Sequence, residues 1–171
     1  TKNFSIVLLE DVTQGAAETA LRSVKHIDND EPLTIINSDQ FFDFNLEEEI
    51  NFFINDEEID GGILTFKKIN DPKWSYVKVD NNDLAIEVAE KKPISENATV
   101  GVYFWKKGSD FVKYAKNMIN KDIRVNNEFY ICPVYNEALI DNKKIKIKNV
   151  KDMIPIGTIE EIKNFELFIK K

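Results

Sequence analysis

The first candidate for chemistry is a polar segment that follows an apolar run. Asn37-Ser38-Asp39-Gln40 closes the run 32–38 (PLTIINS), which has the composition of a buried strand. A carboxylate at the carboxyl end of such a strand lies where open α/β sheets bind their ligands. Mg²⁺ prefers one or two carboxylates together with substrate phosphate oxygens, and Asp39 could supply one. Position alone equally allows Asp39 to cap the following turn.

A second candidate is Glu90-Lys91-Lys92-Pro93, which ends another predicted strand. A lysine held at a strand end and followed by a rigid proline can present its ammonium group to a phosphate. Two lysines before a proline are more often solvated surface residues, so the residue types alone favour the surface role.

Two further segments carry weaker signals. The segment 13–17 (TQGAA) lies between a predicted strand and a predicted helix, where small residues let a planar or anionic ligand approach backbone amides. It is not a P-loop, because the Gly-Lys-Ser/Thr ending is absent. Glu128, within 126–130 (NNEFY), is either a polar residue of a cleft or a helix cap.

The rest of the composition excludes several classes of site. The single cysteine, Cys132, cannot form an intrachain disulfide or a thiolate zinc cluster, and the single histidine, His26, excludes most histidine-based schemes. A formal charge of −7 and scattered lysines argue against nucleic-acid binding. No run of 18 apolar residues is present in the sequence, so we expect a soluble, cytoplasmic protein without membrane segments.

The elements that would position these residues alternate between strands and helices. Predicted strands cover 5–10, 32–38, 61–67, 75–80, 84–91, 99–106 and 144–150, and predicted helices cover 15–26, 46–55, 107–122 and a closing segment from Ile159. The region 127–141 is compatible with either. The first four elements favour a βαβ unit and a parallel sheet, whereas the alternating pattern of 75–80 favours antiparallel pairing.

The 171 residues suffice for one domain. Because the chain begins with Thr1 and an apolar run starts at Phe4, we expect upstream sequence to be missing.

Taken in order, these segments resemble a known family. The series TQGAAETAL, NSDQ, DGGILTF, PKWSYVKVD, EVAEKKPIS, NATVGVYFWKKGSDFVKYA and NNEFYICPVYNEAL is similar to the sugar-phosphate nucleotidyltransferases, the nucleoside-diphosphate-sugar pyrophosphorylases. It is most similar to short bacterial members associated with capsule and surface-glycan precursors. The similarity covers nearly the whole chain in order and spacing.

The resemblance implies a Rossmann-like, three-layer α/β/α core with a mixed, mostly parallel sheet, here a single domain over 1–171 that is N-terminally incomplete. It implies Mg²⁺-dependent transfer of a nucleotide from a nucleoside triphosphate to a phosphorylated small-molecule acceptor. Asp39 matches the metal-binding aspartate, Gln14 and Gly15 match the segment that contacts the base, and Lys92 matches the lysine that meets the acceptor phosphate. The substrate side of the pocket would include Ser75, Glu90, Gly101 and Glu128.

Two departures from the family pattern matter. The glycine-rich signature that ends in a catalytic Arg and Lys belongs upstream of Thr1, so we expect the chain alone to be nearly inactive. Pro155 and Ile156 stand where many relatives place a second metal-binding Asp. A non-catalytic regulatory or assembly subunit of the same fold is the main alternative. The protein could also form a homo-oligomer. A glycosyltransferase would need an Asp-x-Asp pair, which Asp39-Gln40-Phe41 does not supply.

Overall fold

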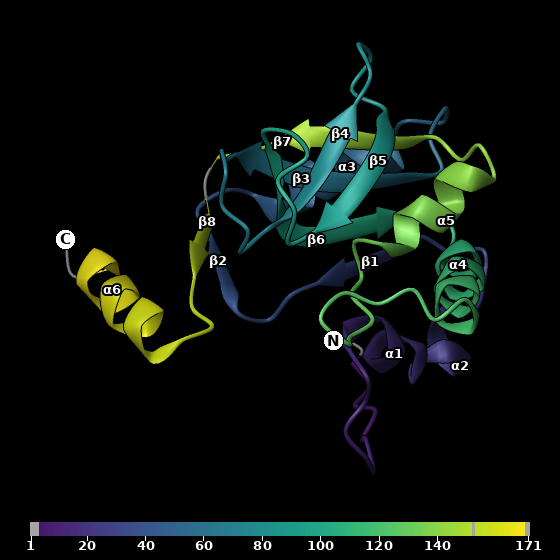
Figure 1. Cartoon of the computed structure of the whole chain (residues 1–171), viewed down its shortest axis with the longest axis horizontal. Coiled ribbons are helices and arrows are strands. Elements are labelled where there is room, and N and C mark those ends of the chain that lie inside the picture. Colours follow the sequence, from purple (N-terminus) through teal and green to yellow (C-terminus); the bar gives the residue numbers. More distant parts are fainter. Residues whose placement is uncertain (1–3, 152, 170–171) are drawn as a thin grey trace.

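The computed structural model describes residues 4–151 and 153–169 and shows a mixed α/β fold (Figure 1). The strands are β1 (Leu33–Ile36), β2 (Gln40–Phe42), β3 (Gly61–Lys67), β4 (Ser75–Val79), β5 (Ala85–Glu90), β6 (Asn97–Trp105), β7 (Ile145–Asn149) and β8 (Met153–Pro155). The helices are α1 (Ala16–Leu21), α2 (Val24–Ile27), α3 (Leu46–Ile54), α4 (Gly108–Asn120), α5 (Val134–Ile140) and α6 (Ile159–Ile169).

Strand β6 is the centre of a six-stranded sheet with the order β5-β4-β6-β3-β7, to which β1 is added along β6. All nine residues of β6 are buried, as its nearly continuous apolar sequence requires. Strand β3 follows one edge of β6 along its length. The other edge is shared, because β1 pairs with residues 102–105 and β4 meets β6 through Tyr76 and Ala98.

The α/β class is confirmed, but the expectation of a mostly parallel sheet is wrong. Among the described strands of this sheet only β3 and β7 pair in parallel, and β1 runs antiparallel to β6. The expectation depended on a strand at 5–10, yet residues 4–9 form no strand, and Phe4 and Leu8 are 82% and 85% exposed. An apolar run becomes a buried strand only where a neighbour pairs with its backbone, and no described strand does so here.

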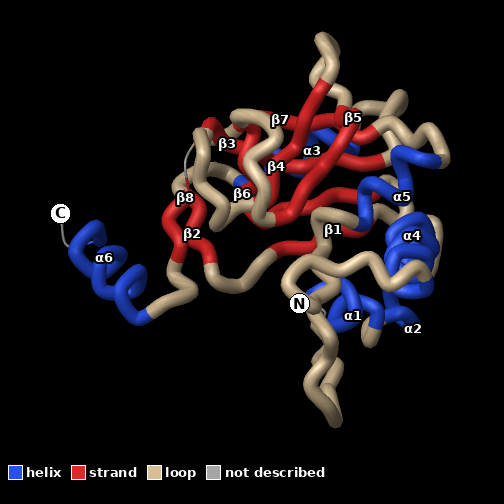
Figure 2. The backbone as a smooth tube through the Cα atoms, viewed as in Figure 1, coloured by secondary structure: helices blue, strands red, loops and turns tan. Residues whose placement is uncertain are grey.

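Helices cover both faces of the sheet, which gives three layers (Figure 2). On one face the ring of Trp105 stacks on that of Tyr135 from α5, with centroids 4.3 Å apart. On the other face Phe104 stacks on Phe53 from α3, with centroids 5.7 Å apart. Adjacent residues of one strand therefore supply the two cores, as the two-residue period of a strand dictates.

Most predicted helices are confirmed. Helix α4 carries its apolar side chains at positions 111, 114, 115 and 118, the spacing of a single buried face. The predicted helix 15–26 is instead two short helices, α1 and α2, separated at Arg22 and Ser23. The undecided region 127–141 contains α5, which is preceded by a tight turn at 125–128.

A smaller unit stands beside the main sheet. Strands β2 and β8 pair with each other, and the predicted closing helix, α6, extends away from the sheet (Figure 1). Helix α6 contacts this unit through Phe165, whose ring centroid lies 4.8 Å from that of Phe41. Within the described chain no helix is long and apolar enough to cross a membrane.

Candidate functional site

Two hollows meet at the carboxyl end of β1. The larger, about 560 Å³, lies between α1 and the end of β1, where Ala16, Thr19, Ala20, Ile36 and Ile131 line it. The smaller, about 230 Å³, is lined by Gln40, Lys73, Trp74, Lys91, Gly101 and Glu161. Four residues line both hollows: Asn37, Asp39, Glu90 and Tyr130. The two spaces therefore adjoin, and Asp39 lies where they meet.

Asp39 is held by the neighbouring β8 segment. Its backbone carbonyl accepts a hydrogen bond of 2.8 Å from the backbone N–H of Ile156. A Cβ at Gly157 would lie 2.8 Å from Oδ2 of Asp39, so the glycine lets this carboxylate lie against the main chain. Ile156, at the position where the family resemblance leads us to expect a second metal-binding Asp, is thus next to Asp39 and has an apolar side chain.

The donor set suits a cation that is held partly by its substrate. No three Asp, Glu, His or Cys side chains come together in the described residues as a ready-made metal cage. Mg²⁺ is bound in many nucleotide sites by one or two carboxylates and by phosphate oxygens. Asp39, exposed at the junction of the two hollows, fits that arrangement as the contribution of the protein.

Gln14 and Gly15 are anchored to the chain segment that forms the far wall of the larger hollow. The backbone N–H of Phe129 donates to the carbonyl of Gln14 at 2.8 Å, and the N–H of Ala17 donates to the carbonyl of Phe129 at 2.9 Å. Gly15 has φ 133°, and a Cβ there would lie 2.5 Å from the backbone of Phe129. Only glycine allows this approach of two main chains. Tyr130, the next residue, lines both hollows.

Glu90 and Ser75 form a pair at the base of the site. The hydroxyl of Ser75 donates a short hydrogen bond to the carboxylate of Glu90. Burial raises the pKa of Glu90, and the hydrogen bond from Ser75 and the positive charge of Lys91 only partly oppose this. Glu128 is exposed on the turn at 125–128, and its negative charge also raises the pKa of Glu90.

The two lysines of the second candidate segment are placed differently. Lys91 lines the smaller hollow; its Nζ donates to the hydroxyl of Tyr130 at 2.6 Å and lies 4.7 Å from the centre of that ring. The hydrogen bond to Tyr130 is the main reason that the pKa of Lys91 is raised. Lys92 is exposed, and its side chain is not part of the lining of either hollow. Sequence reasoning missed Lys91 and Tyr130, because nothing in residue type distinguishes Lys91 from Lys92.

Gly101 forms the floor of the smaller hollow. It has φ 71°, and a Cβ there would lie 2.5 Å from Oε1 of Gln40 and 2.7 Å from Nδ2 of Asn37. That Gln40 oxygen is buried and has no hydrogen-bond partner among the described residues. Buried polar atoms are nearly always paired, so this oxygen is an exception within the described fold. Gln40 was named in the sequence only as a neighbour of Asp39.

Comparison with known proteins adds a family and a fold. The model of a family described as nucleotidyl transferase matches residues 2–167. No curated protein matches the chain significantly.

Two solved structures are similar over most of the chain. A nucleoside-diphosphate-sugar pyrophosphorylase from Vibrio cholerae RC9 is 24% identical with a TM-score of 0.76, over 92% of this chain and 66% of that one. A UDP-glucose pyrophosphorylase complexed with UDP-glucose is 15% identical with a TM-score of 0.77, over 94% of this chain and 64% of that one. This chain thus spans about two thirds of their length. At these identities the likeness establishes the fold.

Proposed function

The chain belongs to the nucleotidyl transferase family, and from that premise we propose that it is part of an enzyme that transfers a nucleoside monophosphate to a phosphorylated metabolite. The donor is a nucleoside triphosphate, and the acceptor is a sugar 1-phosphate or a similar small phosphate ester. The observation that carries this proposal is the meeting of two unlike hollows at Asp39, one flanked by the anchored segment 14–17 and one containing lysines.

The larger hollow suits the nucleotide. Its wall combines small and apolar residues such as Ala16, Ala20 and Ile36 with polar groups at one end. A flat base and its ribose can lie against such a wall, while the phosphates extend toward Asp39. Gln14 and Gly15 are not in its lining, but they directly precede Ala16, which is, and the family resemblance implies that they contact the base.

The smaller hollow suits the acceptor. Lys91 supplies a positive charge for a phosphate, and its present partner, the neutral hydroxyl of Tyr130, can be exchanged for an anion. We keep Lys92 as the alternative phosphate contact, since it is adjacent in the chain. Glu90 and Gly101 line the same hollow. Ser75 supports Glu90 by a hydrogen bond, and Glu128, which lines neither hollow, is assigned to the acceptor side by the resemblance alone.

The chemistry requires positioning and charge compensation. A phosphate oxygen of the acceptor attacks the α-phosphorus of the triphosphate, the bond from that phosphorus to the bridging oxygen breaks, and pyrophosphate leaves with the electron pair. No covalent protein intermediate is needed. Mg²⁺ bound through Asp39 would neutralise phosphate charge, and Lys91 would hold the attacking phosphate in line.

We also propose that the working domain includes more than residues 1–171. No Lys or Arg of the described chain lines the larger hollow, so a triphosphate placed there would be left without cationic partners. The outer edge of β1 is unpaired among the described strands, and the apolar residues 4–9 are exposed beside no strand. A glycine-rich segment with cationic residues, together with the strand that carries it, would supply the missing cations and a partner for the unpaired backbone. The resemblance to short bacterial members supports a cytoplasmic role in making precursors of surface polysaccharides.

The decisive test is pyrophosphate release by the full-length product of the gene that encodes this chain. It would be assayed with Mg²⁺, the four common nucleoside triphosphates and a panel of phosphorylated acceptors, beside the 171-residue chain and an Asp39→Asn variant. Asp43→Asn is the matched control, because Asp43 is an exposed carboxylate four residues further on that lines neither hollow.

We expect release by the full-length protein and its Asp43→Asn variant, with loss in Asp39→Asn and in the 171-residue chain. Silence of a folded full-length protein across the whole panel would contradict the proposal and favour a non-catalytic subunit. Equal activity of Asp39→Asn and the unaltered protein would remove Asp39 from the mechanism.

A further inference from the structure

Gln14 is exposed, yet nearly all its hydrogen-bonding groups are already engaged by the protein. Its backbone N–H donates to Oε2 of Glu18 at 2.7 Å, and its backbone carbonyl accepts from Phe129 at 2.8 Å. Its side-chain oxygen, Oε1, accepts from Nη2 of Arg124 at 2.7 Å. Within the described chain, the amide NH₂ group is the one group of Gln14 for which no partner is found.

Arg124 is held in place before it reaches Gln14. Asn126 and Asn127 have positive φ values of 48° and 65°, the conformation of a two-residue turn, and Val125 and Glu128 exchange backbone hydrogen bonds of 2.9 and 3.1 Å across it. This turn places Arg124 beside Phe129.

Three contacts then fix the guanidinium. It lies 3.8 Å from the ring centre of Phe129, Nη1 donates to the carbonyl of Asn127 at 3.1 Å, and Nε donates to Asp122 at 2.5 Å. The carboxylate of Asp122 compensates its charge. Three contacts therefore orient the guanidinium as a donor toward Gln14, and Asp122 already pairs with it, so these contacts do not favour a phosphate-binding role.

The contact with Arg124 determines the orientation of the Gln14 amide. A glutamine amide can usually turn over, because its oxygen and nitrogen have nearly the same shape. A guanidinium, however, has only donors, so the atom that faces it must be the amide oxygen. Turning the amide over would replace a charge-assisted hydrogen bond by two opposed donors. The NH₂ group is therefore the donor that remains for another molecule to contact.

We propose that Arg124 is a positioning residue that makes Gln14 a donor-only contact and so helps to select the nucleobase of the substrate. This inference rests on the proposed function, in which Gln14 faces the base. A fixed NH₂ group pairs with a base edge that presents an acceptor, such as a ring carbonyl oxygen. If the base edge presents an amino group at that point, this group and the NH₂ group of Gln14 are two donors that face each other. A freely turning glutamine would accept either edge.

Two substitutions at Arg124 distinguish an effect on the orientation of the Gln14 amide from the loss of the contact between residues 124 and 14. Arg124→Lys keeps a donor-only side chain, whereas Arg124→Gln has both donor and acceptor and lets the Gln14 amide adopt either orientation. Both lose the planar contact with Phe129, so that loss cancels in the comparison. Gln14→Glu keeps a partner for Arg124 but removes the NH₂ donor. The chain's other arginine offers the control Arg22→Gln, because Arg22 pairs with Glu18 and does not touch the Gln14 side chain.

The measurements are KM and kcat for each of the four nucleoside triphosphates in the full-length protein, with a thermal melt of every variant. In Arg124→Gln we expect the preference in kcat/KM for the best triphosphate over its competitors to fall by about tenfold, the size of one lost hydrogen-bond discrimination. Arg124→Lys should keep most of the preference. Gln14→Glu should raise KM for the best triphosphate about tenfold, with a smaller change in kcat.

The proposal is overturned if Arg124→Gln keeps the full preference, or if Arg124→Lys loses as much as Arg124→Gln at an equal melting temperature. It is also overturned if Gln14→Glu leaves KM unchanged. Failure of the proposed function has a different signature, since the unaltered full-length protein would then release no pyrophosphate from any triphosphate.

Discussion

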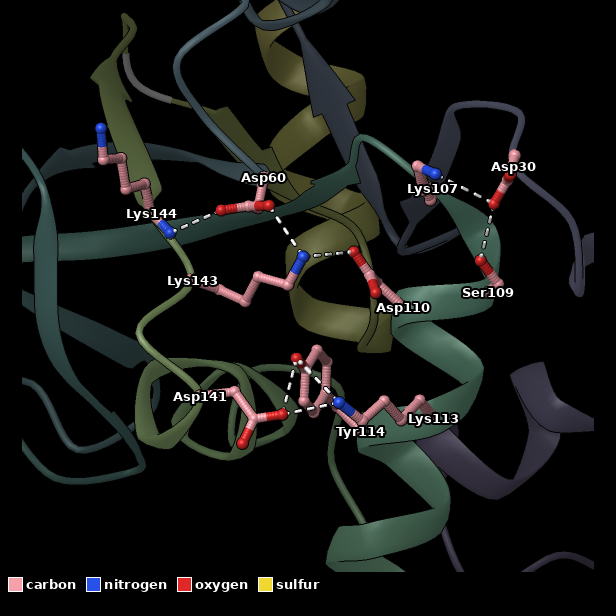
Figure 3. A network of polar contacts seen from close by, with 10 residues as sticks. All are labelled: Asp30, Asp60, Lys107, Ser109, Asp110, Lys113, Tyr114, Asp141, Lys143 and Lys144. Atoms are coloured by element: carbon pink, nitrogen blue, oxygen red, sulfur yellow. Dashed lines mark hydrogen bonds and ion pairs between the residues drawn. The ribbon is translucent and has the colours of Figure 1, made fainter.

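Two regions of the molecule differ in how their polar groups are paired. Beside the start of β3, Nζ of Lys143 lies 2.8 Å from Asp60 and 3.1 Å from Asp110, and a second group joins Lys113, Tyr114 and Asp141 (Figure 3). At the hollows, an oxygen of Gln40 is buried without a hydrogen-bond partner among the described residues.

The difference indicates where binding energy is available. We call Asp60, Asp110 and Lys143 the network. The hydrogen bond to Asp60 is the main reason that the pKa of Lys143 is raised above its usual range. The charged groups of the network therefore stabilise one another and the fold. At the hollows, Lys91 is paired with the hydroxyl of Tyr130, which an anionic group of a ligand can replace. We therefore expect substitutions in the network to change stability and substitutions at the hollows to change activity.

The largest expected effect is at Gly101, where a substitution should lower both stability and activity. Gly101→Ala forces a side chain into contact with Gln40 and Asn37 at a left-handed backbone position. We expect the free energy of unfolding to fall by about 2–3 kcal/mol, measured by urea denaturation. Gly157→Ala is the comparison: it displaces the Asp39 carboxylate from an exposed position, and should lower activity with a much smaller change in stability.

Lys91 and Lys92 sharpen the comparison within one segment. Lys91→Ala should raise KM for the acceptor phosphate by about 10- to 100-fold, because a charge-assisted contact inside the smaller hollow is lost. Lys92→Ala should change the same constant less than threefold, as expected for an exposed side chain. A larger effect at Lys92 would restore the assignment implied by the family resemblance and move the acceptor phosphate out of the smaller hollow.

The network predicts the opposite pattern of effects. Lys143→Ala should lower the free energy of unfolding by about 1–2 kcal/mol, since it leaves two partly buried carboxylates without their cation. Lys144→Ala is the control, because Lys144 contacts Asp60 through its backbone N–H and directs its side chain away from the network (Figure 3). If Lys143→Ala altered catalysis in a fully folded protein, the proposed division between the two regions would be wrong.

The smallest effect is a pH dependence at Glu90. Burial raises its pKa in the folded protein, so between the ordinary carboxyl pKa and the raised value the folded state binds more protons than the unfolded state. Stability therefore falls as pH rises through this interval. Glu90→Gln should remove that decline, so its stability relative to the unaltered protein should increase from pH 4 to pH 7 in urea titrations. An unchanged difference across this range would show that Glu90 is ordinarily solvated.

Local patterns in the sequence were enough to predict most elements. The apolar spacing in α4 indicates a helix with one buried face, and the continuous apolar run in β6 indicates a fully buried strand. Both patterns can be read from residues that are neighbours in the sequence. The position of Asp39 after β1 was likewise predictable, because a strand end is a local feature. The strand at 5–10 was predicted wrongly, since a strand also needs a partner that local sequence does not specify.

The arrangement of the site was decided only by tertiary structure. Whether β1 runs parallel or antiparallel depends on β6, and which lysine of the pair 91–92 enters the hollow depends on the backbone turn at Lys91, where φ is 55°. The hydrogen bond from Arg124 to Gln14 joins residues 110 positions apart. The sequence by itself therefore determined the elements and their order, because burial patterns are local. Pairing direction, side-chain partners and unpaired groups were determined by packing, because they depend on residues that only the folded chain brings together.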